Sequence, residues 1–213
     1  TTNANNYGGM SETWQGVDLN FSARVEGFML QGGFATGKST TDECALNASL
    51  PERINEGAGG LTGGGDTHIP IEYCAHDTPW VSQGSVFGSY TLPGGIDVSG
   101  AFFTRQGTDR LAVINVSAAD AEAALGRAPT ISTISVNVQK PGTAYGDRMN
   151  QFDFRVAKLF GFGSDSDLRA SLDIFNIFNA NAVGRERYTL ASFLQPLGVQ
   201  PGRLMKLSFQ FNF

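Results

Sequence analysis

Long apolar runs are missing from this chain of 213 residues, because polar residues interrupt every apolar stretch. A membrane-spanning helix needs roughly 18 uninterrupted apolar residues, so a helical membrane protein is excluded. Charged residues are also few, at 16% of the chain, and the net charge of −5 includes no basic stripe. Nucleic acid is therefore not an expected partner.

Groups that usually perform catalysis are scarce as well. Only two histidines and two cysteines are present, and no Ser–His–Asp or Cys–His arrangement has supporting context. We therefore expect no enzyme, no cofactor and no metal site. The chain starts at Thr1 rather than Met, and its opening lacks the basic and apolar regions of a signal peptide. We expect it to be processed, trimmed or a fragment.

What the chain does contain is period-two alternation, most clearly over residues 204–213. The apolar side chains that fall on one face of this segment are Met205, Leu207, Phe209, Phe211 and Phe213. The polar side chains on the other face are Lys206, Ser208, Gln210 and Asn212. Such alternation is the signature of a strand with one apolar and one wet face. A run of about ten such residues also lets a tilted strand cross a bilayer.

Six further segments alternate in the same way and are predicted as strands: 16–25, 28–36, 80–92, 96–105, 150–160 and 168–179. The phase slips at Ile174 and Phe175, which predicts a bulge there. The polar faces carry charges of both signs, and the candidate lumen-facing residues are Asp18, Asn20, Arg24, Asp97, Arg105, Asp153, Arg155, Arg169 and Asp173. These residues would form a solvated outer face in a soluble sandwich, whereas in a barrel they line a wet lumen and can pair across strands.

The connections between these segments alternate in length. Three are short, at residues 26–27, 93–95 and 161–167, and three are long, at 37–79, 106–149 and 180–203. Short turns on one rim and long loops on the other are the layout of outer-membrane barrels, with the short turns in the periplasm. The sequence therefore predicts an all-β fold, an antiparallel transmembrane β-barrel segment of about seven strands with long extracellular loops.

The second long loop has order of its own. Ser117 followed by Asp120 is a helix N-cap with an acid three residues on, and Gly126 suits the end of an Ala-rich helix that runs through Leu125. Apolar β-formers at 111–116 and 131–139 flank this helix. We expect a hairpin that projects beyond the membrane and carries a helical cap.

Two local motifs have competing interpretations. Residues 32–39 match the phosphate-loop pattern, but here the pattern ends an amphipathic strand in an antiparallel layout, so we treat the match as chance. Cys44 and Cys74 share one polar loop with His68 and His76. No established zinc spacing fits this set. A Cys44–Cys74 disulfide is the favoured interpretation, and in the entropy model it contributes about 3 kcal/mol.

Several motifs spaced along the chain carry a family resemblance: residues 14–24 (WQGVDLNFSAR), 29–33 (MLQGG), the pair Cys44 and Cys74 before 88–90 (GSY), 141–148 (PGTAYGDR), 172–179 (LDIFNIFN) and the terminal Phe213. Together they resemble the C-terminal part of the barrel of a TonB-dependent outer-membrane receptor of the Oar-like subgroup. The resemblance covers most of the chain and is weakest over residues 53–66. It implies a protein of the bacterial outer membrane that binds a ligand at extracellular loops and imports it into the periplasm.

The family's barrel has about 22 strands around an N-terminal plug, and chain 1–213 would supply its final third. Residues 1–15 then end an extracellular loop, residues 16–213 form strands and loops, and the plug and signal peptide are absent. The resemblance places a C-terminal assembly signal at Lys206, Ser208, Phe211 and Phe213, although the family has Gly at the position of Ser208. The implied partners are outer-membrane lipid, the barrel-assembly machinery, the TonB complex through the missing plug, and an unknown extracellular ligand.

Two other classes stay open. One is a complete small barrel of about eight strands that acts as an adhesin or structural protein, although residues 1–13 offer no alternation for a further strand. The other is a secreted soluble β-sandwich, which would pack its Phe-rich face against a second sheet. Nothing in the loops selects among siderophores, glycans, cobalamin and peptides as the ligand.

Overall fold

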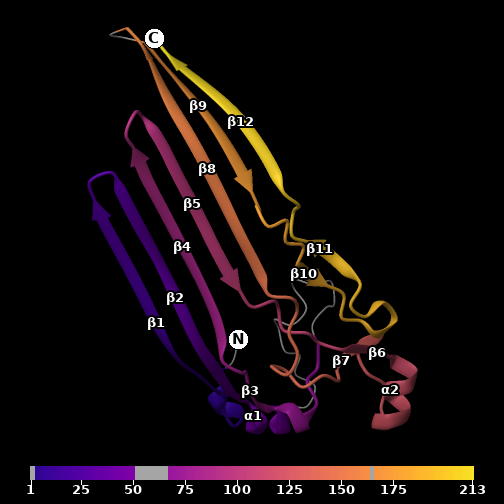
Figure 1. The fold of residues 1–213 in the computed structure, drawn as a ribbon. Coiled ribbons are helices and arrows are strands. Elements are labelled where there is room, and N and C mark those ends of the chain that lie inside the picture. Colours follow the sequence, from indigo (N-terminus) through magenta and orange to yellow (C-terminus); the bar gives the residue numbers. More distant parts are fainter. Residues whose placement is uncertain (1–2, 51–66, 164–165) are drawn as a thin grey trace.

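The computed structural model describes residues 3–50, 67–163 and 166–213. Within these residues the chain forms one long antiparallel sheet and two short two-stranded sheets. The long strands are β1 (Ser11–Val25), β2 (Phe28–Asp42), β4 (Val81–Leu92), β5 (Ile96–Arg105), β8 (Met149–Phe162), β9 (Ser166–Phe175) and β12 (Leu204–Asn212). They lie side by side in that order, so each long strand pairs with the long strands before and after it in the sequence (Figure 1). The predicted all-β, antiparallel architecture is confirmed.

Unbroken pairing registers carry each side of a strand onto the same face of this sheet. Directly paired residues point to the same side of a sheet, so the register joins residues into rows that run across the strands. One such row is Phe21, Gly32, Val86, Phe102 and Phe152. A row on the opposite face is Arg24, Met29, Ser89, Ser99, Arg155, Asp173 and Lys206. The alternation in the sequence therefore becomes one apolar face and one polar face.

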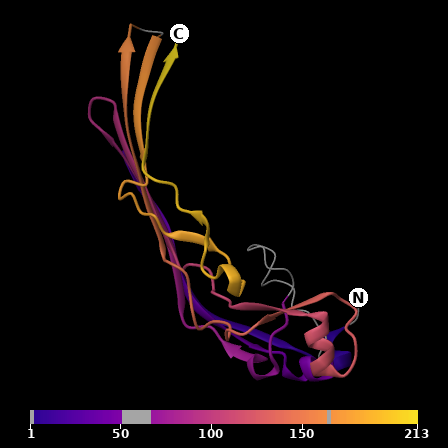
Figure 2. The same ribbon diagram turned by 90° about the vertical axis from the view of Figure 1, so that its right-hand side faces the viewer.

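The sheet bends, and its polar face is the concave one. Figure 2 shows the curvature, with a small hairpin made of β10 (Val183–Glu186) and β11 (Pro196–Val199) on the concave side. Next to this hairpin, the side-chain amide of Gln200 donates to the side-chain oxygen of Gln151 at 3.4 Å. Gln151 belongs to the polar face, because it pairs with Phe103 in the row that includes Asn20. The Phe-rich face is therefore convex.

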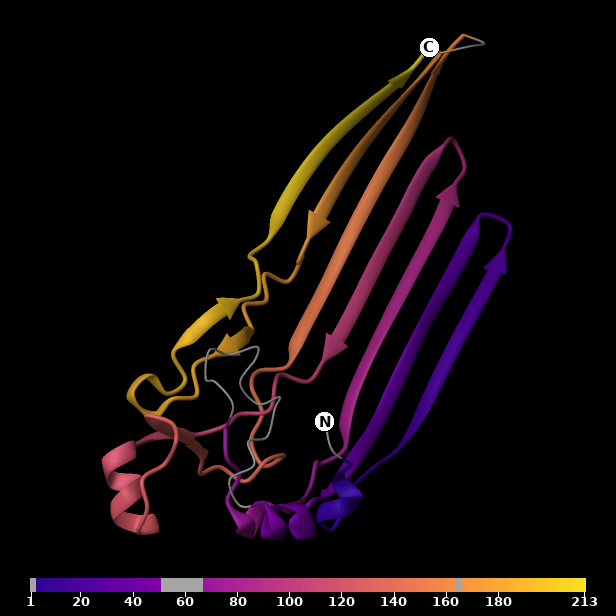
Figure 3. The same ribbon diagram turned by 180° about the vertical axis from the view of Figure 1, so that it is seen from behind.

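The long connections gather at one end of the sheet, and the short turns gather at the other end together with the C-terminus (Figure 3). The short turns at 26–27 and 93–95 lie where the sequence predicts them. The third predicted turn, 161–167, is too long, because β8 continues to Phe162 and β9 already begins at Ser166. The pair Phe162 and Ser166 is the last one of this ladder.

The long connections contain short elements of their own. Those in the described residues are η1 (Ala4–Tyr7), α1 (Cys44–Ser49), η2 (Ile71–Tyr73), β3 (Ala75–Asp77), β6 (Val113–Ser117), α2 (Ala118–Leu125), β7 (Thr133–Asn137), β10, η3 (Leu190–Ser192) and β11. None of the helices in this part of the chain is long and apolar enough to span a membrane. The sequence predicts the β6–α2–β7 unit but misses the other short elements.

Helix α2 begins and ends where its capping residues predict. The Ser117 hydroxyl accepts a hydrogen bond from the backbone N–H of Asp120 at 3.2 Å, which satisfies one of the free donors at the helix start. Gly126 adopts a φ of 69°, in the left-handed region, and its N–H donates to the carbonyl of Glu122. The helical cap on a hairpin is therefore confirmed.

Three expectations about strand ends need correction. Residues 11–15 are not loop, because β1 starts at Ser11 and pairs from there with Asp42 of β2. The strand predicted at 28–36 continues to Asp42. The phosphate-loop pattern at 32–39, treated above as a chance match, therefore lies wholly within β2, where its backbone groups are engaged in strand pairing. The predicted irregularity after Ile174 takes the form of a strand end: Asn176 has a φ of 50°, and the N–H of Ile177 then donates to the carbonyl of Phe152.

The predicted disulfide between Cys44 and Cys74 is present, with a Cα–Cα distance of 4.8 Å. It joins the start of α1 to the residue after η2. Beside it, the N–H of Glu43 donates to the carbonyl of Cys74 at 3.1 Å. The described parts of the first long connection, 43–50 and 67–79, are therefore joined to each other at the loop end of the sheet.

We expect replacement of both cysteines by serine to loosen this connection without disturbing the long strands. The crosslink spans 30 residues of sequence, and a loop of that size loses about 3–4 kcal/mol of stabilisation in the entropy model when it is opened. Hydrogen–deuterium exchange should become faster at residues 43–50 and 67–79 and stay unchanged in β8 and β9. Wild-type protein treated with reductant should behave like the variant; equal exchange in all three samples would contradict the assignment.

Candidate functional site

The polar side chains predicted from the sequence all lie on the concave face of the sheet. By strand, they are Asp18, Asn20 and Arg24 on β1, Asp97 and Arg105 on β5, Asp153 and Arg155 on β8, and Arg169 and Asp173 on β9. The loops that lie over this face come from the same end of the sheet (Figure 2). The concave face and the loop residues that rest on it are therefore the candidate site.

Charges on the β5–β8–β9 side of this face neutralise one another across strands. Arg155 Nε lies 3.0 Å from Asp173 Oδ1, and Arg169 Nη2 lies 2.8 Å from Asp97 Oδ2. The second pair crosses over β8, where Ala157 is only 2% exposed and is short enough to leave room above it. The Arg169–Asp97 pair is half exposed, so it contributes about 0.2–1 kcal/mol, whereas the Asp173 carboxylate is buried beside Arg155. The charged groups on this side of the face are therefore already paired with one another.

Charges on the β1–β2–β4–β5 side have no partner of opposite sign among the described residues. Arg24 and Arg105 donate only to methionine sulfur atoms, at 3.3 Å from Met29 Sδ and 3.1 Å from Met149 Sδ. The Asp18 side chain makes no hydrogen bond or ion pair in this part of the chain. These groups remain available to a ligand.

A hollow lies between these unpaired charges, and we call it the central hollow. Its volume is about 320 Å³, and its walls include Asp18, Asn20, Gln83, Phe103 and Arg105. The floor is low because small residues occupy the middle of the rows, namely Gly33, Ala35 and Ser85. Asp18, Ala35, Gln83 and Arg105 form one row across four strands. The hollow thus has an acid at one end and a base at the other.

The buried Asn176 is one of the residues that fix the β10–β11 hairpin to the β8 side of the concave face. The N–H of Asn176 donates to Asp153 Oδ1 at 2.8 Å. Its side-chain amide donates to the carbonyls of Ala180 and Pro201 at 2.8 Å and 2.7 Å, and its side-chain oxygen accepts from the N–H of Ala180. Asn176 therefore holds both ends of the third long connection against β8.

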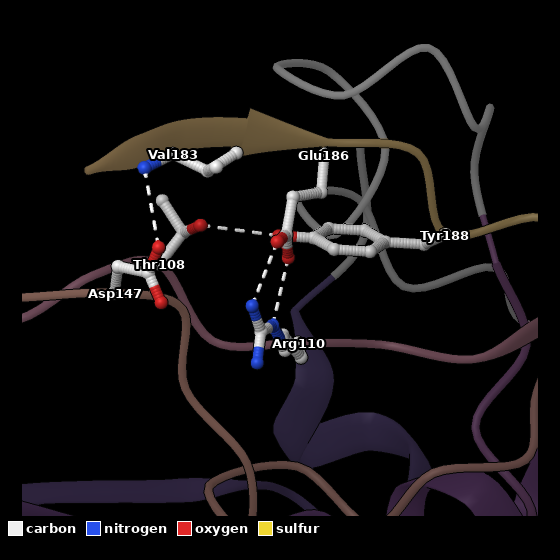
Figure 4. A network of polar contacts seen from close by, with 6 residues as sticks. All are labelled: Thr108, Arg110, Asp147, Val183, Glu186 and Tyr188. Carbon is white, nitrogen blue, oxygen red and sulfur yellow. Dashed lines mark hydrogen bonds and ion pairs between the residues drawn. The ribbon is translucent and has the colours of Figure 1, made fainter. Parts of the chain in front are cut away.

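A second set of contacts joins the hairpin to the second long connection (Figure 4). The guanidinium of Arg110 donates to both carboxylate oxygens of Glu186, at 2.7 Å each. The side-chain hydrogen bonds to Glu186 raise the pKa of Arg110 above its usual value. The hydroxyls of Thr108 and Tyr188 lie 3.1 Å apart, and the N–H of Val183 donates to Asp147 Oδ2 at 3.4 Å.

The same junction encloses the small buried apolar cluster of the described residues, made of Leu111, Val113 and Tyr188. Tyr188 is 4% exposed and Glu186 is also 4% exposed. The carbonyl of Tyr188 accepts from the N–H of Val113 at 2.7 Å. The ion pair, the hydroxyl contact and the apolar cluster together join the second and third long connections. These contacts are of the kind that stabilises the fold of loops.

Asp109, next to this junction, is a carboxylate in an unfavourable position. Its Oδ2 accepts a hydrogen bond from the N–H of Gly142 at 3.0 Å, whereas its Oδ1 is buried without a partner in the described residues. Burial raises the pKa of Asp109 above its usual value. Burial also raises the pKa of Tyr145, and the nearby Asp109 charge adds to that rise. The folded loop therefore favours the protonated acid.

The other predicted residues lie apart from the concave loop junction. Cys44 and Cys74 are joined to each other, and the described residues contain no group of three or more His, Cys, Asp or Glu side chains that could hold a metal ion. On β12, Lys206 and Ser208 are on the concave face and Phe211 is on the convex face. Phe213 follows β12, and its ring centroid lies 5.9 Å from that of Phe211.

Sequence patterns alone did not find two parts of this site. Arg110 and Glu186 are 76 residues apart, so only the folded loops bring them together. Trp14 was assigned to a loop, but it lies in β1 on the concave face. The signal for it was the spacing Trp14-x-Gly16-x-Asp18, which continues the polar face by two further rows.

No protein-family model matches this chain, and no curated protein matches it either.

We expect Arg110→Ala to release the β10–β11 hairpin from the second long connection. The substitution leaves the buried Glu186 carboxylate without its cation, which costs about 2–3 kcal/mol. Amide exchange should rise at residues 183–199 and 108–113. The control is Arg185→Ala, which removes a neighbouring exposed arginine that has no side-chain partner in the described residues. Equal exchange in the two variants would show that the ion pair does not hold the hairpin.

The Asp109 carboxyl should make the loop junction dependent on pH. Because burial raises its pKa in the folded state, its contribution to stability is greatest below its unfolded pKa of about 4 and is lost as the pH rises through the higher folded value. Asp109→Asn removes the charge and keeps an oxygen acceptor for Gly142. We expect this variant to melt above the wild type at about pH 7 and to lose that advantage near pH 4. A variant that melts lower at neutral pH would contradict this view.

Proposed function

We propose that this chain is a section of the transmembrane β-barrel of a TonB-dependent outer-membrane receptor, with its convex face in lipid. The observation that carries the proposal is the continuous apolar convex face. Its large side chains are exposed on strands at both edges of the sheet: Leu19 is 60% exposed on β1, and Phe209 is 65% exposed on β12. Water is a poor environment for such a surface, whereas lipid tails match it.

The distribution of the connections supports the same environment. Three long connections lie at one end, and the short turns lie at the other. Outer-membrane barrels place long loops outside the cell and short turns in the periplasm. In the proposed receptor the β6–α2–β7 unit and the β10–β11 hairpin belong to an extracellular vestibule, and the polar concave face lines the lumen.

Both edges of the long sheet require partners in this environment. Within the described residues, β1 and β12 each pair on one side only. Lipid offers no hydrogen bonds to the free backbone groups of an edge strand, so such an edge has to be paired inside a membrane. In the proposed receptor, further barrel strands pair both edges, and a plug that the TonB complex acts on fills the lumen.

The remaining partners follow from the resemblance and from β12. The strand ends in an aromatic pair, Phe211 and Phe213, and carries Lys206 and Ser208 on its polar side. We assign these residues to recognition by the barrel-assembly machinery. The transport role makes the protein a receptor for an extracellular ligand rather than an enzyme.

A soluble β-sandwich is the less well supported alternative. It requires a second protein layer on the Phe-rich face. In the described residues, the loops rest on the concave side instead (Figure 2). A small complete barrel fits the convex face equally well, but it requires β1 and β12 to pair with each other or with a further strand.

The lipid contact is tested by a charge placed on either face of the sheet. Val86 lies on the convex face, and Gln31 lies on the concave face of the neighbouring strand, paired with Phe87. We expect Val86→Arg to destabilise the folded protein by about 2–4 kcal/mol, the cost of an arginine near the bilayer midplane. Gln31→Arg, the control, should change stability little, because its side chain remains in the wet lumen.

The measurement is the folded fraction of each variant in lipid vesicles over a denaturant series, together with fractionation of cells that express the complete protein. The proposal expects wild type and Gln31→Arg in the outer-membrane fraction and a reduced yield for Val86→Arg. A wild-type protein that is soluble without detergent would refute it.

A further inference from the structure

Trp14 lies flat on the concave face because two glycines leave space for its ring. Gly16 follows it by two residues on the same face, and Gly37 is the cross-strand partner of Gly16. A Cβ atom at Gly37 would lie 2.5 Å from Cζ2 of Trp14, and a Cβ atom at Gly16 would also collide with the ring. Although its ring lies against these two glycines, Trp14 is 56% exposed. One face of the indole is therefore held against the backbone and the other is free.

A second hollow opens beside this ring, and we call it the Trp14 hollow. Its volume is about 240 Å³, and Trp14, Gly37, Ser39 and Thr78 are among the residues around it. Ala35 and Gln83 line both this hollow and the central hollow. The two hollows therefore form one groove at the loop end of the sheet. From Trp14 to Asn20, six residues further along β1, the groove follows the strand for about 20 Å.

The polar groups along the groove have unused hydrogen-bonding capacity. Asp18, Asn20 and Gln83 make no side-chain hydrogen bond in the described residues. The carboxylate accepts, and the two amides both donate and accept. Asp18 and Arg105 are of opposite charge and stand three strand spacings apart, about 14 Å. The groove is thus close to neutral, rich in amide groups, and bounded by Trp14 at one end and Phe103 at the other.

We propose that this groove binds a neutral oligosaccharide. A sugar ring has a face of C–H groups and a rim of hydroxyls. The C–H face fits the free side of a fixed indole, whose π-surface is electron-rich. The hydroxyls each donate and accept, and they match Asp18, Asn20 and Gln83. Among the described residues that line this groove, Arg105 is the one cation, and a strongly anionic ligand would need more. A fully apolar ligand would leave the amides of the groove unpaired.

This inference rests on the proposed function, for which it names the class of ligand. The test uses the complete protein, purified in detergent, with a panel of malto-, cello-, xylo- and manno-oligosaccharides, and measures binding by calorimetry. We expect at least one to bind. Trp14→Ala should weaken that binding about tenfold or more, Trp14→Phe should retain part of it, and Asp18→Ala should weaken it without altering the ring.

Trp80→Ala is the matched control, because Trp80 is similarly exposed, at 58%, but lines neither hollow. Addition of sugar should quench the tryptophan fluorescence of the Trp80→Phe variant. This quenching should be lost in the double variant that carries both Trp80→Phe and Trp14→Phe. The proposal is overturned if no oligosaccharide binds. It is also overturned if Trp14→Ala lowers stability while binding is unchanged, since the ring would then only cover its glycines. Localisation is measured separately: absence from the outer membrane refutes the proposed function, whereas the binding result alone decides the role of the groove.

Discussion

The rest of the structure depends on an unbroken pairing register. Side chains alternate with a period of two, so a slip of one residue in any strand would exchange its two faces. The ladder between β1 and β2 runs from Ser11–Asp42 to Val25–Phe28 without a shift, and the ladders that follow are equally regular. The register therefore sorts apolar and polar residues onto opposite sides across seven strands of the described chain. It also concentrates a large apolar surface that no described loop covers.

The concave face is divided into two halves with different chemistry. On β5, β8 and β9, Arg155, Asp173, Arg169 and Asp97 satisfy one another. On β1, β2 and β4 the middle positions are small, and the charges beside them have no ionic partner in the described residues. A paired surface is stiff and offers little to a ligand, whereas an unpaired one with a low floor offers both space and hydrogen bonds.

The sequence predicts the long strands well and the loop contacts poorly, for physical reasons. Alternation over eight or more residues, as in β5 and β12, specifies both the strand and its apolar side. Ser117 and Gly126 predict a helix because caps act on their immediate neighbours. By contrast, β10 and β11 are four residues each, too short for a period to be visible. Contacts such as that of Arg110 with Glu186 depend on how two distant loops pack together, and a local sequence pattern does not predict such packing.

The position of the β10–β11 hairpin follows from the same division. Asn176 ties it to Asp153, and Gln200 donates to the carbonyl of Asn150 at 3.0 Å, so its anchors are on β8. Arg110 and Glu186 then fix its free side to the second long connection. The hairpin thus lies over the half whose charges are already paired. In the described residues, none of these anchors is on β1, β2 or β4, the strands that hold Trp14 and Asp18 or lie beside them. Within the described part of the chain, one half of the face is therefore closed by the hairpin and by paired charges, and the other half keeps its hydrogen-bonding groups for a ligand that enters from the loop end.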